Sequence, residues 1–583
     1  DLKRKFNFTN EKKKDSKNEF SFAVKNSNLE LMGSSIILLN EKKQRSQLVS
    51  ADTKLTLHNL NYPKNENQSL LFAEGFNLSN KSFEFYSSSN DTISIQDLNY
   101  NSINKTVDIN EFKFIGADKS TSLAIDGIKM KDAFLNDYVQ NKKVNIEEYS
   151  SKKTTLNLII KKDSEKISQM VKLPFESLNI QKLFSNDINI KIYHEENERN
   201  YFVRKADLLI NTLTLDSTLN PKEIHNHINS FVFSGRNYRE NFGKHYTVTA
   251  NDYTFHYPES NFEAHNIKMR SKYDRFEYSK HIDYQNDWFK LDIASLKLNR
   301  LDIDSLLMSQ KFIVNKLEVK NSDFTVFRDL NVPHNDNKKV AMPQKLLSEL
   351  DFAFSVDTIF VNSDIHIHIM PKESSGIGTM TLNIDNGHLF NFRTHHFKND
   401  KPILLQARGK LNEKANFTTK VDFPMPSENG AFHFIGNVGE LNLTALNEML
   451  IPLGAIEVRS GYNEQVNINF KGNDDYAEGL MEFRYNNLKI DILDRETYQS
   501  KGFGNNLKTI FANSFVVSSK NPRWFKMQEG NIFFERIKSR SIFNFWAKAL
   551  LSGAVSSIGI NKSKEEAKAY YKDNMEDVEE NDD

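Results

Sequence analysis

The sequence predicts a mainly β protein: an elongated, curved antiparallel β-sheet that forms a half-open groove, with a few short helices and a C-terminal helix. Three observations lead to this fold class. Apolar and polar residues alternate along most of the chain, a short apolar pattern recurs eleven times, and stretches with helical spacing are few. Alternation with a period of two is typical of strands with one buried and one wet face. It occurs, for example, at residues 54–57, 82–85, 92–95 and 466–470.

The recurring pattern is an apolar residue, two polar or small residues, an apolar residue, one polar residue and a third apolar residue. The first two apolar positions are three residues apart, so in a regular strand they would point to opposite faces. A β-bulge or bend at the polar pair would restore a single apolar face, and repeated bends would curve the sheet. Chance is the competing explanation, and regular strands at most sites would support it. The copies are Leu57/Leu60/Tyr62, Ile95/Leu98/Tyr100, Ile109/Phe112/Phe114, Ile125/Ile128/Met130, Phe175/Leu178/Ile180, Ile210/Leu213/Leu215, Ala264/Ile267/Met269, Ile293/Leu296/Leu298, Val314/Leu317/Val319, Val356/Ile359/Val361 and Tyr485/Leu488/Ile490.

Helical spacing is confined to four short stretches before residue 541. Each fits an amphipathic helix of two or three turns. The segment 328–343 is rich in turn-forming residues and ends in a proline, so we place a boundary near residue 340. The expected helices lie at residues 132–140, 302–310, 344–350 and 443–450.

The division of the chain follows from these signals. We expect a repetitive β-groove body over residues 1–340, a second β region over 341–540, and a C-terminal helix with an acidic tail over 541–583. The chain opens in strand-like sequence at residues 20–24, so we expect N-terminal truncation or processing. The window 541–560 is the most apolar one. We expect it to cap the end of the groove; the alternative is a bilayer-interface helix anchored by Phe545 and Trp546.

Composition excludes several classes of function. Lys and Arg balance Asp and Glu at 77 each, so the chain lacks the basic field that nucleic-acid binding requires. The absence of cysteine excludes disulfides, thiolate metal sites and cysteine nucleophiles. Motifs for phosphate loops, nucleophile elbows and metalloprotease helices are missing. We therefore expect neither an enzyme nor a cofactor. The chain contains 44 Phe residues, and the fold must shield this large aromatic surface from water.

Histidine offers one candidate metal site. His366 and His368 lie two residues apart in an Ile-His-Ile-His-Ile run, so on a strand both imidazoles share a face. The pair at 395–396 could add a third ligand, with Asp364 and Glu373 nearby. A strand whose wet face carries histidine explains the same pattern, and structural sites usually need four ligands. We predict that His366 and His368 bind no metal.

Beyond residue 340 the chain shows an ordered series of features: a small helix, a proline, a rising strand with Ser-Gly, a strand, a glycine and a further strand. The residues concerned are 356–364, 376, 380–387, 409–411, 421–424, 432–439, 443–447, 452, 456–461 and 479–488. In this region the chain resembles the C-terminal part of AsmA-like envelope proteins, the group that includes TamB. The segment 540–553 resembles the end of Bacteroidetes-type proteins of this kind.

The resemblance implies a non-catalytic cell-envelope protein that carries or shields lipid acyl chains in an apolar β groove. Such a protein would support lipid transport between inner and outer membrane, or outer-membrane biogenesis. The implied location is the periplasm, with an inner-membrane anchor helix that is absent from this sequence. Phospholipid or another lipid, the inner or outer membrane, and envelope proteins are the implied partners. The alternative is a scaffold subunit of an envelope complex whose groove is filled by its own side chains.

Eight apolar residues are the predicted lining of the groove. Their neighbours Lys297, Glu318 and Lys489 are charged, so each strand would have one face for hydrocarbon and one for water. The predicted lining residues are Leu296, Leu298, Leu317, Val319, Ile359, Val361, Leu488 and Ile490.

Overall fold

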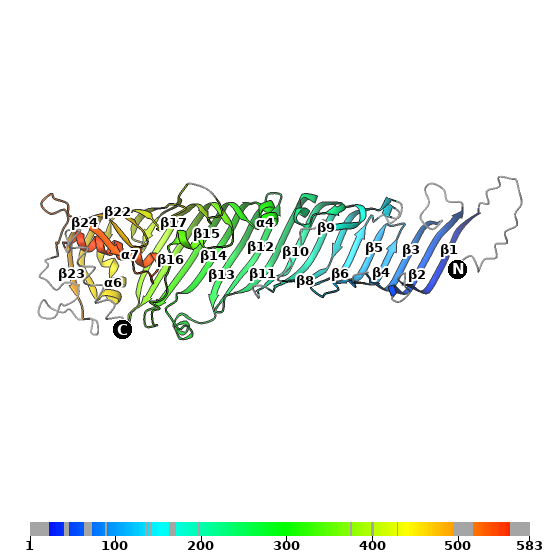
Figure 1. Cartoon of the computed structure of the whole chain (residues 1–583), viewed down its shortest axis with the longest axis horizontal. Helices are drawn as coiled ribbons and strands as arrows, with labels where there is room; N and C mark the ends of the chain where they lie inside the picture. Colours follow the sequence, from blue (N-terminus) through cyan, green and yellow to red (C-terminus); the bar gives the residue numbers. More distant parts are fainter. Residues whose placement is uncertain are drawn as a thin grey trace. The chain divides into compact units, whose positions relative to one another are not determined.

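The computed structural model describes residues 22–559 except 40–45, 63–72, 88–89, 134–136, 139–140, 162–170, 196–198, 373–375, 398–400, 428 and 495–516. The fold is mainly β, a mixed sheet of 24 strands with a few short helices, which confirms the predicted fold class (Figure 1). The elongated, curved form and the half-open groove stay predictions. Contacts divide the chain into two compact units, Asp1–Phe231 and Val232–Asp583.

The first unit begins with an antiparallel meander of six strands. β7 and β8 follow; both pair antiparallel with β6 and parallel with β9, which pairs antiparallel with β10. The parallel pairings depart from the purely antiparallel sheet expected from sequence. The elements are β1 (Phe22–Leu39), β2 (Ser46–Tyr62), β3 (Ala73–Tyr86), β4 (Thr92–Asn101), β5 (Thr106–Ile115), β6 (Thr121–Lys131), β7 (Lys143–Ser151), β8 (Lys153–Ile160), β9 (Val171–His194), β10 (Arg199–Leu219) and η1 (Pro221–His227).

The second unit continues the antiparallel order, except that β15 and β16 run parallel. β11 (Ile228–Phe242) contains the division between the units. The other elements are β12 (Tyr246–Tyr257), β13 (Asn261–Ser271), α3 (Arg275–Tyr278), η2 (Ser279–His281), β14 (Trp288–Leu301), α4 (Ile303–Ser309), β15 (Phe312–Asp329), α5 (Pro343–Ser348), β16 (Phe354–Met370), β17 (Gly378–Arg393), β18 (Ile403–Leu411), β19 (Ala415–Phe423), β20 (Phe432–Val438), β21 (Leu441–Asn442), η3 (Leu443–Leu446), α6 (Asn447–Gly454), β22 (Ile456–Gly472), β23 (Tyr476–Ile492), β24 (Glu529–Glu535) and α7 (Ile542–Ser557).

The predicted short helices correspond to structural elements with small shifts of their ends. α4 matches the stretch 302–310, because Asp302 caps its first turn and Gln310 ends it in the left-handed conformation. α5 begins one residue before the predicted helix, and η3 with α6 covers residues 443–454. The stretch 132–140 lies partly outside the described residues.

At the recurring pattern the strands are interrupted, as the prediction of a bulge or bend requires. At six of the eleven copies the second polar residue has positive φ: Asn59, Asp97, Gly127, Thr212, Asn266 and Asn487. Elsewhere the ladder skips residues at the polar pair, as between Val356 and Thr358, which pair with Phe392 and Phe390 around the left-handed Asn391. The bend at Thr212 has the expected effect on the side chains, since Ile210, Leu213 and Leu215 are all buried in one hydrophobic cluster.

The largest hydrophobic cluster, here called the closed core, lies in the second unit. It joins inward side chains of β18 to β24 with residues of α5, η3 and α7, among them Val421, Phe470, Met481 and Phe545. α7 packs on β24 and β23 (Figure 1), so this apolar segment covers part of the sheet, and its role as the cap of a groove stays a prediction. Hydroxyls of Ser552 and Ser556 accept hydrogen bonds from the β24 amides of residues 533 and 531, so the helix also satisfies the outer edge of β24.

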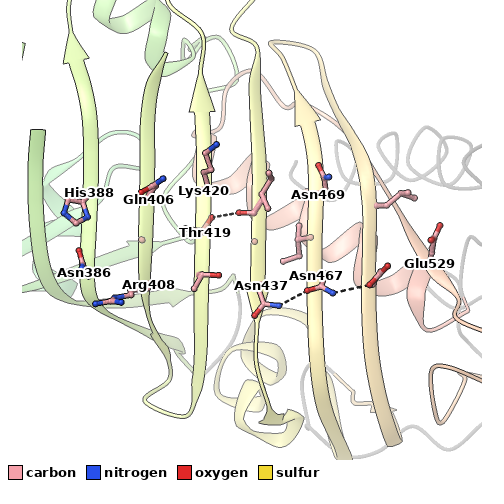
Figure 2. A pocket seen from close by; sticks show the side chains of 17 residues that line it. Asn386, His388, Gln406, Arg408, Thr419, Lys420, Asn437, Asn467, Asn469 and Glu529 are labelled. Carbon is pink, nitrogen blue, oxygen red and sulfur yellow. Dashed lines mark hydrogen bonds between the residues drawn. The ribbon is translucent and has the colours of Figure 1, made fainter. Parts of the chain in front are cut away.

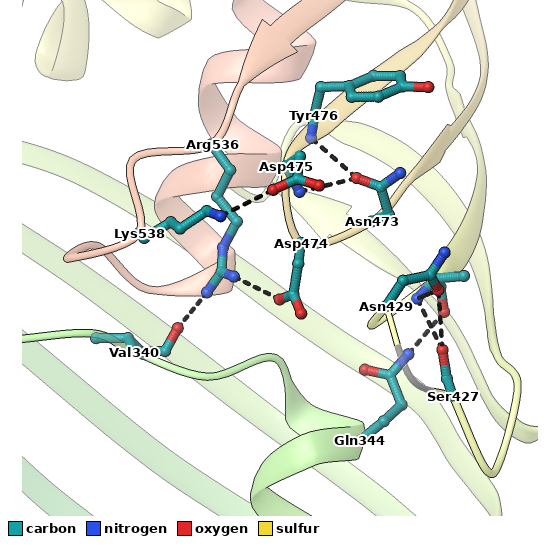
Figure 3. Close-up of polar contacts among 11 residues, drawn as sticks. Val340, Gln344, Ser427, Asn429, Asn473, Asp474, Asp475, Tyr476, Arg536 and Lys538 are labelled. Atoms are coloured by element: carbon teal, nitrogen blue, oxygen red, sulfur yellow. Dashed lines mark hydrogen bonds and ion pairs between the residues drawn. The ribbon is translucent and has the colours of Figure 1, made fainter.

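The crossover between the parallel strands β15 and β16 is held by a polar clamp. Arg536, whose side chain is 2% exposed, donates one hydrogen bond to Asp474 at 2.8 Å and another to the carbonyl of Val340 (Figure 3). Burial lowers the pKa of Arg536, and the charge of Asp474 partly opposes that effect. The predicted boundary near residue 340 thus falls inside the second unit; the three-part division stays a prediction.

Candidate functional site: an apolar face across β12 to β16

Six of the eight predicted lining residues lie together in two cross-strand rows. In the first row Leu298 pairs with Leu317, and Leu317 with Ile359. In the second row Leu296 pairs with Val319, and Val319 with Val361. Pairing across the neighbouring strands extends the first row to Phe262 and Phe255 and the second to Ala264 and Tyr253. These ten residues are called the apolar rows below.

The first row continues directly into the closed core. Ile359 pairs with Leu389, and the row proceeds through Leu405, Val421 and Phe434 to Phe470. Burial changes along this line: Val421 is 0% and Phe470 is 1% exposed, whereas Leu298, Leu317 and Ile359 are only half-buried. Leu389 is the first member that packs against the closed core. The same apolar face is therefore covered at one end and partly accessible at the other.

Leu488 and Ile490 do not belong to the apolar rows. Both lie on β23, and Leu488 is 5% exposed inside the closed core, against which Ile490 also packs. The bulge at Asn487 turns Leu488 toward the same interior as Tyr485. Sequence alternation identified their face correctly but could not distinguish a covered part of that face from an open one.

The opposite side of β13 to β15 is charged, as the sequence predicts. Glu263 and Lys297 pair across the strands and form a salt bridge, and Glu318 is the cross-strand neighbour of Lys297. Hydrogen bonds from Lys316 and Lys320 lower the pKa of Glu318. The pKa of Glu263 is lowered by its hydrogen bond from Lys297. Both carboxylates are thereby held ionised on the face turned away from the apolar rows.

On this polar side, farther along the sheet, lies a shallow hollow of about 860 Å³ over β17 to β24. Figure 2 shows its polar side chains projecting from successive strands. Asn437 donates to Asn467 at 2.7 Å, and Asn467 donates to Glu482 at 3.1 Å. Arg408 and Lys420 lie on β18 and β19. The hollow offers neutral amides together with positively and negatively charged side chains. Sequence reasoning missed this hollow because the register of the strands was unknown.

The histidines of β16 make local contacts. His366 lies 3.2 Å from the Thr381 hydroxyl and 3.6 Å from a carboxylate oxygen of Asp323. Desolvation lowers the pKa of His368, assisted by the charges of Arg275 and His366. The rings of His395 and His396 contact each other in a tilted arrangement, with their centroids 4.0 Å apart. Among the described residues, no group of three or more His, Cys, Asp or Glu side chains is arranged to hold a metal ion.

Comparison with known proteins identifies no family. No family model matches the chain, and no curated protein matches it. The AsmA-like resemblance therefore remains an expectation from the residues. Within the part of the chain that the structure describes, no helix is long and apolar enough to cross a bilayer.

Proposed function

We propose that the protein is a non-catalytic cell-envelope protein that carries or shields lipid acyl chains on the apolar rows. The observation that carries the proposal is the change in burial along a single cross-strand row, from the closed core to half-buried side chains at β14 to β16. Binding of hydrocarbon to such a surface is favourable, by roughly 0.8 kcal/mol for each CH₂ group that is buried.

The chemistry of the rows favours acyl chains over a polar ligand. Leu, Ile, Val and Phe side chains offer dispersion contacts without directional hydrogen bonds, so they accept flexible hydrocarbon of variable length. The ion pairs lie on the other face, where they keep that side hydrated. AsmA-like architecture, periplasmic location and a role in transport between the membranes belong to the same proposal.

A scaffold protein is the second candidate, and the closed core favours it. There, α7 and α5 cover the sheet, and Phe432, Phe470 and Phe545 fill the interior with edge-to-face contacts. In this alternative the apolar rows have no lipid ligand and serve only as one side of the sheet.

A matched pair of aspartate substitutions distinguishes the two functions. Val361→Asp places a carboxylate on the accessible part of the face, where water can reach it, so we expect the melting temperature to fall only slightly. Crosslinking of the purified protein to a phospholipid with a photoreactive acyl chain should then drop severalfold. Leu488→Asp buries an unpaired carboxylate in the closed core, at a cost of several kcal/mol, and should unfold the second unit.

Thr358→Asp is the control, because Thr358 lies beside Ile359 on the opposite face of β16. It should leave crosslinking unchanged. Crosslinking that is absent from the wild-type protein, or that survives Val361→Asp at full yield, would contradict the lipid proposal and favour the scaffold.

A further inference from the structure

We propose that the turn formed by Arg523, Trp524, Phe525 and Lys526 is a membrane-docking tip that inserts two aromatic side chains into an anionic bilayer surface. The inference goes beyond the proposed function and does not rest on it, because it concerns a different surface and different residues.

The two aromatic side chains of the turn are exposed to an unusual degree. Trp524 is 84% and Phe525 is 103% exposed, although residues of this size usually bury most of their surface. Single exposed apolar residues are common, but two adjacent aromatic side chains at a loop tip form a concentrated apolar patch. Trp in particular is enriched at membrane–water interfaces.

The backbone of the turn adopts a strained conformation at these two aromatic residues. Arg523 and Lys526 exchange two backbone hydrogen bonds, of 3.1 and 3.0 Å, which leaves Trp524 and Phe525 as a two-residue loop. Their φ angles are +50° and +64°. Turns with positive φ at both central residues favour Asn-Gly, because bulky side chains are disfavoured there. Strain of this kind concentrates at functional sites.

The base of the turn is anchored rigidly to β23. Asn521 is 2% exposed, and its side-chain amide donates hydrogen bonds to the carbonyls of Phe483 and Gln528. Its backbone N–H and C=O both pair with Tyr485. The tip therefore projects from a fixed platform, so little conformational entropy would be lost when it inserts.

The positive charges beside the tip favour a membrane surface with anionic headgroups. Lys520, Arg523 and Lys526 are exposed, and none of them forms an ion pair with another described residue. Residues 517–528 contain no Asp or Glu. Cations beside inserted aromatic side chains complement anionic headgroups. A protein partner is the other conceivable occupant, and the experiment treats it as a contrary outcome.

The test is flotation of the full chain with vesicles of phosphatidylglycerol and, separately, phosphatidylcholine. We expect the wild-type protein to bind the anionic vesicles, with binding that weakens as salt rises. The double variant Trp524→Asn/Phe525→Gly should lose binding by about tenfold or more. The same variant should melt at a higher temperature, because Asn-Gly suits the turn, so loss of folding cannot explain the result.

Phe242→Ser serves as the control, since Phe242 is also exposed, at 65%, at the end of another strand. It should bind like the wild type. Wild-type protein that binds neither kind of vesicle, or an Asn-Gly variant that binds undiminished, would overturn the proposal. Val361→Asp should not alter flotation, so failure here and failure of the acyl-chain proposal can be told apart.

Discussion

At the scale of single residues, burial decides how much an ion pair contributes to the stability of the fold. Arg536 and Lys538 lie two residues apart and pair with the adjacent carboxylates Asp474 and Asp475, each at 2.8 Å (Figure 3). The Arg536 side chain is 2% exposed, whereas those of Lys538 and Asp475 are 54% and 68% exposed. The first pair is the better shielded from water, although the Asp474 side chain is 28% exposed. Only Arg536 also holds the crossover, through its hydrogen bond to the carbonyl of Val340.

We therefore expect Arg536→Ala to lower the free energy of unfolding by about 2–3 kcal/mol, because it leaves Asp474 and the Val340 carbonyl without their shared donor. Lys538→Ala, the matched control, should cost less than about 1 kcal/mol. Urea unfolding monitored by circular dichroism measures both. Equal effects of the two substitutions would mean that the clamp contributes nothing beyond a surface ion pair.

At the scale of the element, a left-handed residue within a strand reverses the usual residue preference of that strand. Asn266 on β13 is exposed and has a φ of +50°. At an exposed position of a regular strand, valine is favoured over asparagine. In the left-handed conformation a β-branched side chain is disfavoured by about 1–2 kcal/mol, whereas glycine is accepted.

Asn266→Val should therefore destabilise the protein by about 1–2 kcal/mol, and Asn266→Gly should change stability by less than about 0.5 kcal/mol. Chemical denaturation of the two variants provides the measurement. Stabilisation by valine would show that β13 runs as a regular strand in solution, and the explanation of the recurring pattern by bulges or bends would then fail.

At the scale of the whole molecule, hydrophobic burial is divided among separate clusters. The closed core lies in the second unit, while the clusters around Leu213 and around Phe76 lie in the first. Proteins built from successive strands that contact mainly their neighbours need not unfold as one cooperative unit.

We expect Met481→Ala, which removes a 4% exposed side chain from the closed core, to cost about 2–5 kcal/mol. Amide hydrogen exchange should accelerate in peptides of β20 to β24 and stay unchanged in β9 and β10. Leu213→Ala should produce the reverse pattern. A single transition that both substitutions shift equally would indicate one cooperative unit instead.

The sequence by itself determined the local structure of this protein. Period-two alternation identified the strands and their apolar faces, the polar pairs marked the bulges and bends, and Asp302 and Gln310 set the ends of α4. These features depend on interactions within a few residues, so their signals are contained in short stretches of chain.

Only the tertiary structure decided which residues meet and which are covered. It placed Leu317 beside Leu298 and Ile359, ran β15 parallel to β16, and put Leu488 under the closed core. It also left Trp524 exposed on a turn. Short-range signals could have predicted the turn, but they could not have predicted that its side chains are exposed. Register and cover depend on contacts between segments tens to hundreds of residues apart. Two leucines with the same local pattern can therefore have different roles.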